Sequence, residues 1–173
     1  MSKKVLIAYF SRRGNNYVSG SIVNLEVGNT EVAAAMIQKI TDGDMFEIES
    51  TKVYPKDYHE ATKVAQDEYR KNARPELTDT VSDMDSYDVI FLGYPNWWGT
   101  MPMPVFTFLE SYDFSGKTII PFCTHEGSGM GRSENDIKKL CPKTSVKNGL
   151  SIRGSSVKGA EKEISKWIVK TLG

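Results

Sequence analysis

Two adjacent tryptophans give the clearest indication in this chain of a site that binds a ligand. Trp97 and Trp98 lie in the segment Gly93-Tyr94-Pro95-Asn96-Trp97-Trp98-Gly99, which follows an apolar run and contains proline and glycine, the residues that mark turns. A loop seldom buries two indoles, and exposing them is unfavourable unless a flat partner covers them. We therefore expect at least one of them to stack on a planar ligand, the alternative being that both close over the core.

A second segment with polar side chains follows the apolar run 118–123. It reads Thr124-His125-Glu126-Gly127-Ser128-Gly129-Met130-Gly131, and its alternate glycines would let the backbone approach a flat ligand closely. His125 beside Glu126 suggests acid–base chemistry, but a lone histidine in a loop more often serves as a hydrogen-bonding group than as a catalyst. The sequence contains no nucleophile elbow and no metal-ligand spacing, so it indicates neither hydrolysis nor a metal site.

A third polar segment, Ser11-Arg12-Arg13-Gly14-Asn15-Asn16, follows the apolar run 5–10. Its short side chains suit a tight turn, and a helix start nearby would aim free N–H groups at an anion. The helical periodicity, however, begins only at Thr30, with Asn29 or Thr30 as the expected N-cap residue. The polar segment between them, about 17–28, is interpreted as a loop insertion that divides one phosphate-binding turn. It is either a surface excursion or a flap over the ligand.

The three segments fit one architecture, because apolar runs alternate with helical patterns along the chain. The expected strands are 5–10, 45–48, 88–94, 118–123 and 146–152, and the expected helices are 32–40, 58–69, 105–109, 133–140 and 160–172. This alternation predicts an α/β protein with a parallel sheet and helices on both faces. Ligands of such folds bind at the carboxyl ends of the strands, which is where all three segments lie. Pro121 predicts a bulge or an edge in the fourth strand.

Composition narrows the function classes. A chain of 173 residues suits one domain, and 22 basic against 22 acidic residues give no excess of positive charge for binding nucleic acid or an anionic membrane. The longest apolar runs are as short as strands, so we expect no membrane insertion. The N-terminus shows no signal-peptide pattern, and Cys123 and Cys141 form no disulfide framework. We therefore expect a cytoplasmic protein.

Three motifs together resemble those of the flavodoxin-like FMN-binding family, and the resemblance covers essentially the whole chain from Val5 onwards. They are Tyr94-Pro95-Asn96-Trp97-Trp98-Gly99, Asp113-Phe114-Ser115-Gly116-Lys117-Thr118 and Thr124-His125-Glu126-Gly127-Ser128-Gly129. The resemblance implies one α/β domain over residues 1–173. It implies a flavodoxin-like three-layer α/β/α sandwich whose five-stranded parallel sheet has the order 2-1-3-4-5.

The resemblance also implies a cofactor, FMN, and the residues that bind it. Ser11, Asn15, Asn29 and Thr30 match the family's phosphate turn, here interrupted, so that either asparagine is a candidate for the same role. Arg12 and Arg13, which flank Gly14, depart from that turn, and they either neutralise the phosphate or point to solvent. Pro95 to Gly99 (Pro95, Asn96, Trp97, Trp98 and Gly99) would hold one face and an edge of the flavin ring, and Thr124 to Gly129 (Thr124, His125, Glu126, Gly127, Ser128 and Gly129) its pyrimidine side.

Two function classes follow from the resemblance. The first is a redox protein that transfers electrons between redox partner proteins or small electron acceptors. The alternative is an NAD(P)H-dependent FMN quinone reductase, which must leave one face of the flavin open for nicotinamide. The carrier is favoured because no segment of the sequence marks a nicotinamide site. A third class is an FMN-binding domain without turnover of its own.

Overall fold

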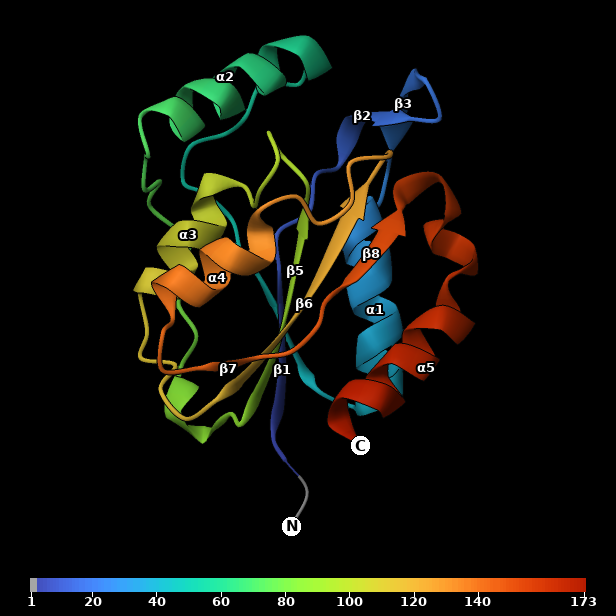
Figure 1. The fold of residues 1–173 in the computed structure, drawn as a ribbon. Helices are drawn as coiled ribbons and strands as arrows, with labels where there is room; N and C mark the ends of the chain where they lie inside the picture. Colours follow the sequence, from blue (N-terminus) through green and yellow to red (C-terminus); the bar gives the residue numbers. More distant parts are fainter. Residues whose placement is uncertain (1–2) are drawn as a thin grey trace.

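The computed structural model describes residues 3–173, and a parallel sheet forms its centre (Figure 1). The strands of this sheet are β1 (Val5–Tyr9), β4 (Asp44–Glu47), β5 (Val89–Pro95), β6 (Thr118–His125), β7 (Ser145–Val146) and β8 (Leu150–Arg153). Their order is β4-β1-β5-β6, and β7 and β8 both pair with β6. The expected fold class and the strand order 2-1-3-4-5 are therefore confirmed.

Helices cover both faces of the sheet, because its strands are apolar on both sides. Alternate residues of β1 point to opposite faces: Ile7 packs with α1 (Asn29–Thr41) and α5 (Glu161–Leu172), whereas Leu6 packs with α3 (Met103–Glu110) and α4 (Ser133–Leu140). The remaining helix, α2 (Tyr58–Arg70), lies near the carboxyl ends of the strands (Figure 1). The three layers expected from the sequence are therefore present. None of the helices within residues 3–173 combines the length and the apolar character needed to cross a bilayer.

The last strand of the sheet differs from the single strand expected at 146–152. It consists of β7 and β8, which pair with residues 118–119 and 122–125 of β6 respectively. Pro121 lies in the gap between these pairings, where Gly149 runs beside β6 without pairing with it. Proline lacks the N–H that a ladder needs, so the bulge or edge expected there takes the form of an interrupted pairing.

The expectation of an irregular loop at about 17–28 was wrong. Residues 14–25 form an antiparallel hairpin, β2 (Gly14–Val18) and β3 (Ser21–Leu25), which starts three residues earlier than the expected insertion. Its turn residues Ser19 and Gly20 both have positive φ, 50° and 85°, as two-residue hairpin turns require. Neither face of the hairpin enters the core, and Tyr17 remains 45% exposed. Because neither face is buried, the two strands need no alternation of apolar and polar residues, and their sequences lack this usual mark of a strand.

Candidate functional site

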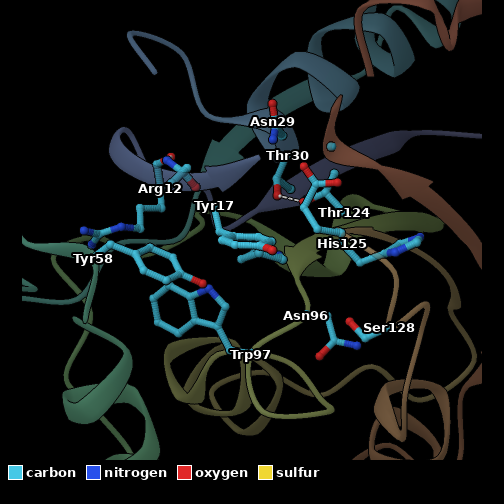
Figure 2. A pocket seen from close by; sticks show the side chains of 14 residues that line it. Arg12, Tyr17, Asn29, Thr30, Tyr58, Asn96, Trp97, Thr124, His125 and Ser128 are labelled. Carbon is cyan, nitrogen blue, oxygen red and sulfur yellow. Dashed lines mark hydrogen bonds between the residues drawn. The ribbon is translucent and has the colours of Figure 1, made fainter. Parts of the chain in front are cut away.

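A cavity of about 320 Å³ lies at the carboxyl ends of the sheet strands, within the size range of small-molecule sites (Figure 2). Ten of the residues expected to bind the ligand line it: Arg12, Asn29, Thr30, Pro95, Asn96, Trp97, Thr124, His125, Glu126 and Ser128. Eight others lie outside its lining: Ser11, Arg13, Gly14, Asn15, Trp98, Gly99, Gly127 and Gly129. The structure thus gathers residues from all three segments around one space.

The start of α1 forms one end of this cavity. Its N-cap residue is Gly28, which has no capping side chain, so the expectation that Asn29 or Thr30 would be the cap was wrong. The hydroxyl of Ser11 instead accepts a hydrogen bond from the backbone N–H of Glu31 at 3.1 Å. Within residues 3–173, the N–H groups of Asn29 and Thr30 have no hydrogen-bond partner. A helix start with free N–H groups is an anion site.

The turn after β1 and the start of α1 touch each other although the hairpin separates them in sequence. A Cβ added to Gly28 would lie only 2.1 Å from the hydroxyl oxygen of Ser11, so this junction requires glycine. The hydroxyls of Thr30 and Thr124 are hydrogen-bonded at 2.7 Å, which ties the helix start to the end of β6. Asn15, in contrast, lies in the hairpin opposite Asn24. Of the two candidate asparagines, the structure places Asn29 at the helix start.

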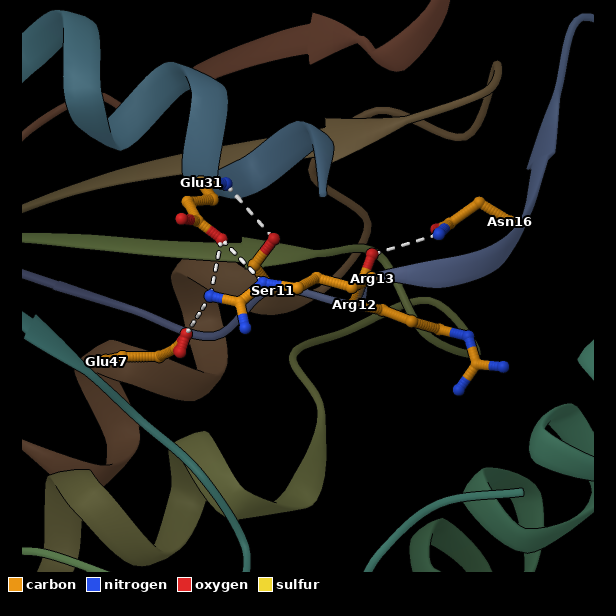
Figure 3. A network of polar contacts seen from close by, with 6 residues as sticks. All are labelled: Ser11, Arg12, Arg13, Asn16, Glu31 and Glu47. Atoms are coloured by element: carbon orange, nitrogen blue, oxygen red, sulfur yellow. Dashed lines mark hydrogen bonds and ion pairs between the residues drawn. The ribbon is translucent and has the colours of Figure 1, made fainter. Parts of the chain in front are cut away.

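The two arginines of the turn have different surroundings, and their side chains point in opposite directions (Figure 3). Arg13 forms ion pairs with Glu31 at 3.2 Å and Glu47 at 3.3 Å. Arg12 donates to the backbone carbonyls of residues 15, 55 and 56 at 2.8 to 3.1 Å. Burial lowers the pKa of Arg12, whereas hydrogen bonding to Glu31 raises that of Arg13. Arg13 is therefore paired with carboxylates outside the cavity, and among the described residues that line the cavity Arg12 alone is a lysine or arginine.

The adjacent tryptophans lie in separate environments. Trp97 lines the cavity and makes edge contacts with Phe10 and Tyr54, with ring centroids 5.1 and 5.3 Å apart. Trp98 is 45% exposed, and its indole N–H donates to the carbonyl of Thr62 at 3.0 Å. The alternative, that both indoles close over the core, does not hold, because Trp98 is exposed. Trp97 is the indole that a ligand in this cavity would contact.

The loops after β5 and β6 are tied to each other through Asn96. Its side-chain amide donates to the carbonyl of Gly129 at 2.8 Å, and its amide oxygen accepts from the N–H of Gly99 at 2.9 Å. The N–H of Arg132 donates to the carbonyl of Gly99 at 2.7 Å. Gly99 and Gly129 therefore belong to the frame that holds the cavity lining in place.

His125 and Glu126 are both committed to local interactions. The Nδ1 atom of His125 accepts from the N–H of Gly127 at 2.8 Å, so the neutral ring carries its proton on Nε2. Burial, with a smaller effect of Arg153, lowers the pKa of His125. One carboxylate oxygen of Glu126 accepts from the N–H of Ser19 at 3.0 Å. The other is buried and lies 4.0 Å from the Nη1 atom of Arg153, an ion pair without a hydrogen bond. That oxygen can therefore still accept a hydrogen bond.

Four residues of the cavity were missed by reasoning from the sequence: Asn16, Tyr17, Tyr58 and Gly154. Tyr17 comes from the hairpin and Tyr58 from the first turn of α2, and their rings lie 6.3 Å apart with a tilt of 31°. Tyr58 was assigned to the periodic pattern of its helix, and Tyr17 lies in the segment read as a loop. A Cβ on Gly154 would lie 2.4 Å from the side-chain nitrogen of Asn29, so close packing requires glycine there, a requirement that the sequence does not signal.

Comparisons with known proteins agree with this geometry. The family model of flavodoxin matches residues 4–171. The structure is similar to that of a protein provisionally classed as a flavoprotein from Bacteroides eggerthii, with 28% identity, 99% of each chain covered and a TM-score of 0.80. A protein of the same provisional class from Bacteroides uniformis has 29% identity over 98% of this chain and 99% of its own, with a TM-score of 0.76.

A third similar structure is a flavoprotein in complex with FMN from Lactobacillus acidophilus. It has 24% identity over 91% of this chain and 98% of its own, with a TM-score of 0.65, and therefore supports the fold. No curated protein matches the chain. Since the family model spans nearly the whole sequence and the sheet has the corresponding strand order, the chain belongs to the flavodoxin family.

Proposed function

We propose that this protein binds FMN in the cavity and transfers electrons between redox partner proteins or small electron acceptors. The observation that carries the proposal is the combination of free N–H groups at Asn29 and Thr30 with the indole of Trp97 in one cavity. Free N–H groups at a helix start bind a phosphate, and an indole stacks on a flat aromatic ring. The FMN complex of the Lactobacillus acidophilus flavoprotein, a protein with the same fold, supports this choice of ligand.

The donors and acceptors of the cavity fit the two ends of FMN. The phosphate would be held by the start of α1, where the helix dipole also favours negative charge. The pyrimidine part of the flavin has an imide N–H, and the buried carboxylate oxygen of Glu126 accepts no hydrogen bond within the described chain. The flavin itself, when bound, supplies the ability to take up and release electrons.

The remaining side chains of the cavity orient the ligand and exclude water. Trp97 is fixed by its edge contacts with Phe10 and Tyr54, so it offers a preformed flat surface. The hairpin lies across the cavity from this loop, and its tip is held by the hydrogen bond from Ser19 to Glu126. The negative charge of Glu126 would disfavour additional negative charge on the ring and so lower its midpoint potential, an effect that the ion pair with Arg153 at 4.0 Å would reduce.

The hairpin favours the electron carrier over the quinone reductase. A carrier exposes only an edge of its flavin, whereas a reductase needs an open face for nicotinamide. Tyr17 places an aromatic ring on the hairpin side of the cavity, which is consistent with a covered face. We further propose a cytoplasmic location, in keeping with the free and buried thiols of Cys123 and Cys141.

Titration of the purified protein with FMN, followed by anaerobic addition of NADPH or NADH, tests this proposal. We expect one FMN per chain, with quenched flavin fluorescence, and no rapid bleaching by either nucleotide. Dithionite, which needs no binding site, should bleach the bound flavin and serves as the control. Absence of FMN binding would refute the proposal. Rapid bleaching by NADPH or NADH would instead establish the reductase.

A further inference from the structure

A second cavity, of about 260 Å³, lies between α2 and the loop after β5. Ala61 and Ala65 of α2 form one side of it, and the indoles of Trp97 and Trp98 form another. Arg12, Tyr58, Asn96 and Trp97 line both cavities, so the second adjoins the first. The second cavity is the one that the side chain of Trp98 borders.

The shape of the second cavity follows from small residues facing large ones. Ala61 and Ala65 are one helical turn apart, point to the same side of α2 and are 4% and 6% exposed. Methyl side chains at both positions leave space between the helix and the loop. The indole of Trp98 is held at this space by its hydrogen bond to the carbonyl of Thr62. The cavity is therefore bordered by aromatic rings and methyl groups, which suits a flat apolar molecule.

Two polar groups of this cavity are donors that no carbonyl or carboxylate of the described chain occupies. Arg12 uses Nε and one terminal nitrogen for backbone carbonyls, and within residues 3–173 its Nη1 makes no hydrogen bond. The hydroxyl of Tyr58 also has no hydrogen-bond partner in that part of the chain, and no carboxylate lines the cavity. A guanidinium N–H in a partly buried place gains most from an acceptor oxygen on a ligand.

From these observations we propose that the second cavity binds a planar bicyclic aromatic molecule with a carbonyl-type oxygen that faces Arg12 and Tyr58. The two indoles provide the flat contact surface, and the free N–H and O–H groups fix the orientation of the oxygen. The inference goes beyond the proposed function, because it assigns a second ligand to a cavity other than the one proposed for FMN. It concerns binding and includes no electron-transfer step.

The test uses FMN-loaded protein, oxidised and without reductant, and 2,3-dimethyl-1,4-naphthoquinone as the probe. This quinone has no free ring position between its carbonyls for reaction with thiols. We expect saturable binding by equilibrium dialysis, and at least tenfold weaker binding of 2,3-dimethylnaphthalene, which has the same ring system without the oxygens. Equal binding of the two compounds would refute the role of Arg12 and Tyr58.

Ala65→Leu is the decisive variant, because its side chain would fill the second cavity without lining the first. It should weaken quinone binding at least tenfold and leave FMN affinity within about twofold. Lys63→Leu, on the exposed side of the same helix, is the matched control and should change neither. Unchanged quinone binding in Ala65→Leu would overturn the proposal, as would a parallel loss of FMN, which would make the second cavity part of the first.

A measurement on the unaltered protein keeps the proposal testable if Ala65→Leu does not fold. In a nitrogen–proton correlation spectrum, the quinone should shift the indole N–H signal of Trp98. The indole N–H of Trp167, which donates to the carbonyl of Asn148, should stay in place. Shifts at Trp167 alone, or at neither indole, would contradict the proposal even if FMN binds as proposed.

Discussion

The two sides of the first cavity are built in different ways. On one side, the loops after β5 and β6 are fixed by hydrogen bonds between their own backbones and the side chain of Asn96. On the other side, Tyr17 of the hairpin and Tyr58 of α2 contact each other through tilted rings, and the hairpin tip is held at Glu126. We refer to these as the fixed wall and the hairpin wall.

The difference shows how the cavity can be both preformed and accessible. Backbone hydrogen bonds between two loops leave few alternative conformations, so the fixed wall should keep its shape with or without a ligand. The hairpin packs no side chain into the core, and a segment with few buried apolar contacts opens at low cost. We therefore expect the fixed wall to provide most of the binding energy and the hairpin wall to control entry and exit.

The largest effect is expected where the two loops of the fixed wall touch. Gly131 has a φ of 57°, and a Cβ there would lie 2.2 Å from the carbonyl oxygen of Gly99. Gly131→Ala should lower the free energy of unfolding by roughly 2–4 kcal/mol, through overpacking and left-handed strain. Urea unfolding checks this. Gly159→Ala, which meets no atom within 4 Å, is the control and should change stability by less than about 1 kcal/mol.

The next effect separates the two adjacent tryptophans. Trp97→Ala should weaken FMN binding at least tenfold, since it removes the flat surface of the fixed wall, a loss of about 1.4 kcal/mol or more. Trp98→Ala should change FMN affinity less than about threefold, because Trp98 borders the second cavity and not the first. Fluorescence titration measures both affinities. An equal loss of FMN affinity in the two variants would contradict the assignment of the two indoles to different cavities.

A smaller effect is expected on the hairpin wall. Tyr17→Ala should weaken FMN binding about threefold, mainly through faster dissociation, because the ring covers the cavity and Trp97 remains. Tyr17→Phe keeps the ring and should bind FMN as the unaltered chain does. Stopped-flow measurement of flavin release after dilution gives the rates. If Tyr17→Ala cost more affinity than Trp97→Ala, the assignment of the two walls would be reversed.

The smallest effect concerns the carboxylates beside the turn after β1. Burial, followed by hydrogen bonding to Glu49, raises the pKa of Glu47 to about 7. The folded chain therefore binds this proton more tightly than the unfolded chain, in which a glutamate titrates near pH 4.3. The contribution of Glu47 to the free energy of unfolding should fall as the pH rises through both pKa values, from about 4 to about 8, and change little above that range.

Urea unfolding at several pH values measures this dependence. Glu47→Gln should reduce the slope between pH 5 and pH 7, whereas Glu163→Gln, on an exposed position of α5, should leave it in place. An unchanged slope in Glu47→Gln would show that other groups cause it.

The sequence allowed the fixed wall to be predicted but not the hairpin wall. The sheet and the loops of the fixed wall could be predicted because apolar runs, prolines and glycines act locally, and Gly127, Gly129 and Gly131 all have positive φ. The hairpin could not, since its strands have polar residues on both faces. Tyr17 and Tyr58 were missed for a related reason: their place in the cavity depends on how a hairpin and a helix dock, which is tertiary information.

The roles of the arginines were also beyond the sequence. Arg12 and Arg13 are adjacent, yet one binds backbone carbonyls and the other two carboxylates that lie 18 and 34 residues further along the chain. The capping of α1 could not be predicted for the same reason. The hydroxyl that accepts from the N–H of Glu31 belongs to Ser11, which lies in the turn before the hairpin. Interactions between distant segments decide these roles.

The most direct test of the central claim is a nitrogen–proton correlation spectrum of the labelled protein with and without one equivalent of FMN. Our account predicts shifts at the backbone N–H groups of Asn29 and Thr30 and at the indole N–H of Trp97, with the indole N–H of Trp167 unchanged. If FMN leaves these three signals in place, or binds with shifts confined to other parts of the chain, the account is contradicted.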